Sequence, residues 1–114
     1  KETNMPSINV SQLLTDMLNA AKGPILAQWP NARDYAETEF KKIGETILFI
    51  EKQRLMGKMS KEQAPIHLEM QKNASMAVLL AIEGLGLLAV EAAINAALQV
   101  IKDTVNTALN FPLI

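Results

Sequence analysis

Residues 60–109 read SKEQAPIHLEMQKNASMAVLLAIEGLGLLAVEAAINAALQVIKDTVNTAL. Ser60 and Gln63 have the spacing of a capping box, in which the two side chains satisfy the free N–H groups at a helix start. After Pro65 the stretch contains no proline, and Gly84 and Gly86 are its weak points, each costing about 1 kcal/mol relative to alanine. We therefore predict one helix over residues 61–109, about 72 Å long. The alternative is a break at Gly84–Gly86.

Two further helices precede this stretch. Apolar residues recur at three- and four-residue spacing behind Ser7, a residue type that caps helices, and Gly23-Pro24 ends the pattern, which predicts a helix over 8–22. After Pro30 a proline-free stretch with one apolar stripe ends at Gly57 and predicts a helix over 31–56. The chain is therefore expected to be all-α.

The composition bounds the domain count and the chemistry. The 114 residues suit a single domain over 1–114, with irregular tails at 1–7 and 110–114. The absence of cysteine excludes disulfides, thiolate metal sites and a cysteine nucleophile. A formal charge of −1 gives no field that would recruit nucleic acid. No secretory signal is visible, which predicts a cytoplasmic protein whose N-terminus is processed or truncated.

The length of the third helix predicts an oligomer. A compact domain of this size has a radius of gyration of roughly 13 Å, so a helix of about 72 Å does not fit inside it. We expect an elongated fold in which 31–56 and 61–109 form an antiparallel hairpin and 8–22 packs along the second half of 61–109. Such a fold leaves the long helix partly uncovered. We therefore predict a four-helix-bundle-like dimer or a higher oligomer.

The segment from Ala74 to Val90 is apolar on nearly every side, which is typical of a helix that is buried between partners or in lipid. It is at the short limit for a membrane span, and Glu83 lies at its centre, where a carboxylate is costly. Membrane association is therefore the less favoured interpretation. A helix buried against a second subunit is favoured.

Glu83 is the most informative polar residue, because it falls within an apolar stripe and a buried carboxylate needs a partner. The register of the expected hairpin places Glu83 beside Tyr35 and near Arg33. A contact with either residue would fix the register of the hairpin. The alternatives are a functional carboxylate that lines a cavity or a metal site, and simple exposure on an open face.

The same register places Glu51 near His67, the single histidine of the chain. A glutamate and a histidine can bind a metal or move protons, and Glu45 is a further candidate ligand. A hydrogen-bonding histidine on the surface is the alternative.

The predicted function is that of a non-enzymatic helical oligomerisation or protein-interaction domain, with the apolar face of 61–109 as its contact surface. We predict no cofactor, because the chain lacks a phosphate-binding loop, a dinucleotide fingerprint and a nucleophile elbow. A metal-binding or redox bundle built on buried carboxylates is the alternative, and a membrane-active helical hairpin is a third hypothesis.

Overall fold

The computed structural model describes residues 6–114, and every regular element within that range is helical. Four α-helices and one short 3-10 turn follow one another: α1 Val10–Ala21, the 3-10 turn Leu26–Gln28, α2 Trp29–Leu55, α3 Ala64–Leu80 and α4 Leu87–Leu109. The first two α-helices begin and end within two residues of their predicted bounds. Of the irregular tail predicted at 1–7, residues 1–5 lie outside the described range.

The single helix predicted over 61–109 is wrong, and so is the count of three helices. The chain leaves the helical conformation at Ala81 and returns to it at Leu87, so the break lies at the alternative position. Gly84 has a φ of +90° there, a left-handed conformation that glycine adopts without steric cost. The turn lets α4 fold back across the molecule instead of extending α3.

The fold is compact because of this break. It measures 47 × 22 × 19 Å and has a radius of gyration of 14.3 Å, close to the roughly 13 Å of a compact domain of this size. A rod as long as a helix of about 72 Å is therefore wrong, although the molecule is still about twice as long as it is wide. The sequence-based reason for expecting a rod came from that helix, and two shorter helices remove it.

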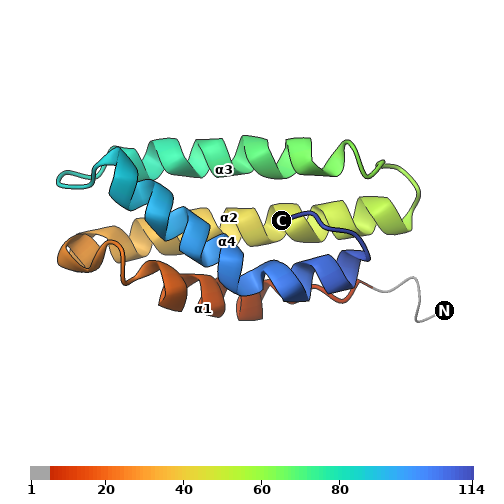
Figure 1. Cartoon of the computed structure of the whole chain (residues 1–114), viewed down its shortest axis with the longest axis horizontal. Helices are drawn as coiled ribbons and strands as arrows, with labels where there is room; N and C mark the ends of the chain where they lie inside the picture. Colours follow the sequence, from red (N-terminus) through yellow and green to blue (C-terminus); the bar gives the residue numbers. More distant parts are fainter. Residues whose placement is uncertain (1–5) are drawn as a thin grey trace.

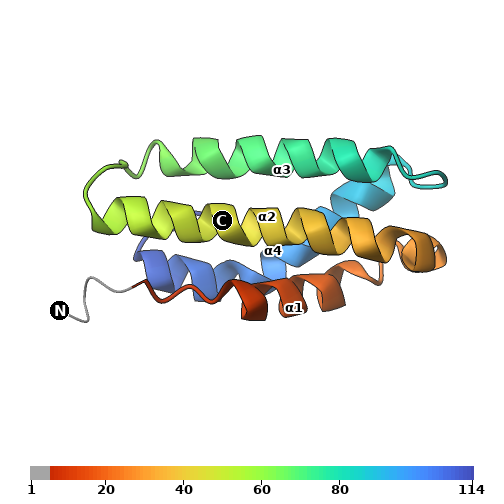
Figure 2. The same cartoon turned by 180° about the vertical axis from the view of Figure 1, so that it is seen from behind.

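The helices form one layer of three and a fourth that crosses it. α2 lies between α1 and α3, and α4 runs diagonally over one side of this layer from the end of α3 to α1 (Figure 1). Among the described residues, no helix crosses the other side, where α2 lies in front with α3 and α1 on either side of it (Figure 2). The two sides of the α1–α2–α3 layer are thus covered unequally.

The core lies between α1, α2 and α4. Its largest fully buried side chains come mainly from these three helices: Leu13, Met17, Phe40, Ile43, Ile47, Ile50, Val90, Ile94, Ile101 and Val105. Gly44 belongs to the same region, since a Cβ added there would lie 3.1 Å from Cγ1 of Val10, so glycine lets α1 approach α2 closely. In contrast, α3 buries only Ala64, Leu68, Ser75 and Leu79.

Local sequence sets the helix ends. Asn9, rather than Ser7, caps α1: its Oδ1 accepts a hydrogen bond from the backbone N–H of Gln12 at 3.0 Å. The reciprocal hydrogen bonds of the predicted capping box form, since Ser60 Oγ accepts from the Gln63 N–H at 3.1 Å and Gln63 Oε1 accepts from the Ser60 N–H at 2.9 Å. They close a turn at 60–63, and α3 begins after it at Ala64 rather than at residue 61. Asn110, with a φ of 61°, ends α4.

Candidate binding surface

The outward side of α3 carries several apolar side chains that face solvent, and the polar residues Glu69 and Asn73 are exposed among them. Ile66 is 59% exposed and Met70 is 66% exposed, and Ala74 and Ala77 are also exposed. The spacing of these four residues places them on one side of the helix, and we call them the α3 stripe. A charged residue is absent from the stripe. A surface of this kind is typical of a site that contacts another molecule.

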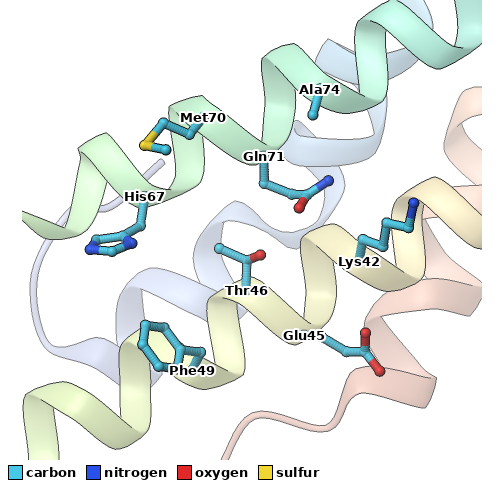
Figure 3. A pocket seen from close by; sticks show the side chains of 8 residues that line it. All are labelled: Lys42, Glu45, Thr46, Phe49, His67, Met70, Gln71 and Ala74. Carbon is cyan, nitrogen blue, oxygen red and sulfur yellow. The ribbon is translucent and has the colours of Figure 1, made fainter.

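A groove between α2 and α3 adjoins the stripe. Its volume is about 520 Å³, and its lining comes from both helices: Lys42, Glu45, Thr46, Phe49, His67, Met70, Gln71 and Ala74 (Figure 3). Phe49, which is 46% exposed, packs against His67 with a ring-centroid distance of 5.9 Å. The groove therefore has an aromatic end at Phe49 and His67, apolar residues Met70 and Ala74 on its α3 rim, and polar or charged residues along most of its remaining length.

The three residues predicted as metal ligands are not brought together. Glu45 and His67 both line the groove, but the carboxylate of Glu45 points away from the imidazole (Figure 3). Glu51 is buried on another side of α2, where it accepts hydrogen bonds from Ser7 and Ile8. Within residues 6–114, no group of three potential ligands could hold a metal ion.

Glu83 lies in the turn between α3 and α4 and is exposed, so the burial expected for it is wrong. It does lie near Tyr35, as the register predicted, because both residues line a cavity of about 410 Å³ between α2 and the end of α3. Arg33 lies elsewhere and forms an ion pair with Glu37 at 3.1 Å. Because Glu83 is exposed, water solvates its carboxylate. Burial in an apolar stripe would have removed this solvation.

Two polar clusters that the sequence did not reveal hold the ends of the described chain. Glu51 binds residues 7 and 8, and Asn106 binds residues 113 and 114 through its side-chain amide. Both contacts join a side chain to the backbone of a segment without regular structure. Hydrophobic periodicity reports nothing about such contacts, so the sequence offered no signal for them.

No protein-family model, curated protein or solved structure matches the chain. None of the helices described is both long enough and apolar enough to cross a membrane.

Proposed function

We propose that the chain is a helical self-association module, and that the α3 stripe and the α2–α3 groove of one copy pack against the same surface of a second copy. One observation carries this proposal. The α3 stripe is uncharged, apolar and uncovered, while α4 crosses the opposite side of the layer. Burial of Ile66, Met70 and Phe49 would remove the largest apolar side chains of this surface from water.

A second copy fits the charges of this surface. The groove contains one cation and one anion, Lys42 and Glu45, and the formal charge of the whole chain is −1. Two copies therefore meet without strong net repulsion. An antiparallel arrangement about a twofold axis would set the stripe of each copy over the groove of the other, as ridges pack into grooves between helices.

The available surface is large enough for a weak dimer. α3 has 17 residues, so the face of α2 and α3 is about 26 Å long and about 20 Å wide. Two such faces bury roughly 1,000 Å² in total, near the lower bound for a specific interface. The resulting four helices, two from each copy, correspond to the four-helix-bundle-like dimer that the sequence predicts. We expect micromolar rather than nanomolar affinity.

Light scattering coupled to size exclusion tests this proposal. At about 100 μM we expect the wild-type chain to have twice the mass of one chain and the Met70→Glu variant to have the mass of one, because a buried unpaired carboxylate is costly. Val100→Glu is the matched control, since Val100 is 50% exposed on α4 and does not line the groove. A monomeric wild type, or a dimer that survives Met70→Glu, would contradict the proposal.

Neither of the other predicted functions gains an observation that favours it. The metal-binding or redox bundle would need ligands that converge, and Glu45, Glu51 and His67 do not. The membrane-active hairpin would gain support from a long apolar helix, and no described helix is both long and apolar enough to cross a membrane. The cytoplasmic location stays a prediction.

A further inference from the structure

The last four residues fold back over the molecule and enter the space between α3 and α4 (Figure 1). The side chain of Asn106 holds this tail by its backbone. Asn106 Oδ1 accepts hydrogen bonds from the N–H groups of Leu113 at 2.9 Å and Ile114 at 3.0 Å, and its Nδ2 donates to the main-chain oxygen of Ile114 at 3.3 Å. The Leu113 N–H also lies 3.0 Å from the main-chain oxygen of Phe111, so Asn106 holds a tight turn around Pro112, and it does so through backbone groups whatever the side chains.

The residues around the tail favour aliphatic side chains at positions 113 and 114. Leu113 is buried, and both Leu113 and Ile114 line a cavity of about 300 Å³ together with Leu68 of α3 and Leu98 of α4. Two adjacent aliphatic residues therefore meet an aliphatic wall on each side.

The tail does not fill this space. Beyond Leu68 and Leu98 the cavity is lined by polar residues of both helices, Glu69, Lys72, Asn95 and Gln99. α3 and α4 meet at the 81–86 turn and diverge from it, so the space between them is a wedge (Figure 1). A peptide that continues past the two aliphatic positions would meet both hydrogen-bond donors and hydrogen-bond acceptors on these side chains.

We propose that the α3–α4 wedge is a binding site for a peptide in which a tight turn is followed by two adjacent aliphatic residues, and that residues 111–114 occupy this site as an intramolecular competitor. This site is separate from the α2–α3 groove and does not depend on the proposed self-association. A tethered segment acts at an effective concentration in the millimolar range, so a free peptide at lower concentration is excluded until the tail is released. The occupant would bind through the same Asn106 amide and the same aliphatic walls.

The test uses the full chain and a fluorescein-labelled peptide with the sequence of residues 110–114, Asn-Phe-Pro-Leu-Ile. Leu113→Asp should release the tail and increase the affinity for this peptide at least about tenfold over the wild type, because the tethered competitor is removed. Adding Asn106→Ala to Leu113→Asp should abolish the gain. Fluorescence anisotropy measures binding, and circular dichroism checks that each variant is folded.

Two results would overturn the proposal: equal affinity of the wild type and a folded Leu113→Asp variant, or a gain that survives Asn106→Ala. If Leu113→Asp does not fold, hydrogen exchange of the wild type decides. Exchange of the Leu113 and Ile114 amides much faster than that of the buried α4 residues Ile101 and Val105 supports a releasable tail. Equal protection of the two groups shows that the tail is a fixed part of the core and contradicts the proposal.

Discussion

The buried carboxylate of Glu51 ties the N-terminal segment to α2. It accepts hydrogen bonds from the Ser7 N–H at 2.9 Å, the Ser7 Oγ at 2.8 Å and the Ile8 N–H at 2.9 Å. Ile8 is buried beside this contact. A single side chain therefore satisfies three donors and holds an apolar residue in the core, which accounts for a charged group that is only 4% exposed.

We expect Glu51→Ala to lower the free energy of unfolding by about 2 kcal/mol, because three donors lose a charged acceptor. Glu45→Ala is the control on the exposed side of the same helix and should change the stability little. Chemical denaturation of both variants measures the difference. Equal stability of the two would show that the segment at residues 7 and 8 contributes nothing through this contact.

The position of Glu51 shows how far single residues could be predicted. The antiparallel pairing of α2 and α3 was predicted from the turn around Gly57, but His67 lies against Phe49 rather than Glu51. A shift of two residues turns a helical side chain by about 200°, so it moves Glu51 to a different side of α2. Tyr35 and Glu83 still share a cavity, because that cavity accepts side chains from more than one position on α2 and α3.

At the scale of elements, helix ends marked by strong local signals could be predicted, whereas the break between α3 and α4 could not be decided. Two glycines cost only about 2 kcal/mol in a helix. The local sequence does not show how much free energy of packing the chain gains when the helix breaks there. This gain comes from tertiary packing. Folding back lets α4 bury Val90, Ile94, Ile101 and Val105 against the core, which outweighs the hydrogen bonds of a continuous helix.

Gly84 gives this explanation a test. With a φ of +90° and a Cβ position only 3.0 Å from Nε2 of Gln28, Gly84→Ala should lower the free energy of unfolding by about 1–3 kcal/mol. Gly23→Ala is the matched control in the α1–α2 connection, where a Cβ would meet nothing within 4 Å, and should change it by less than about 1 kcal/mol. Thermal unfolding of the two variants makes the comparison. A Gly84→Ala variant that is as stable as Gly23→Ala would mean that the chain tolerates a different turn between α3 and α4.

At the scale of the whole molecule, the long axis has two unlike ends. The α1–α2 connection and the α3–α4 turn lie together at one end (Figure 1), where Leu26 and Leu87 are exposed and Leu88 is 82% exposed. Residues 23–32 and 80–90 contain a single charged residue, Glu83. The α2–α3 connection, at the other end, is rich in lysine. The chain therefore has two exposed apolar surfaces, this end and the α2–α3 face, and they predict dimers of different shape.

We expect the side-by-side dimer, because an end-to-end twofold contact would bring the two exposed Glu83 carboxylates toward each other. The α2–α3 face also offers a groove for a helix, whereas the end of the molecule consists of two turns. Small-angle scattering at about 100 μM should then give a maximum dimension that stays near the 47 Å length of one copy while the cross-section thickens. Leu88→Glu should leave both the mass and this length unchanged. A maximum dimension near twice the length of one copy, lost on Leu88→Glu, would instead assign the contact to the apolar end and leave the α3 stripe exposed in the dimer.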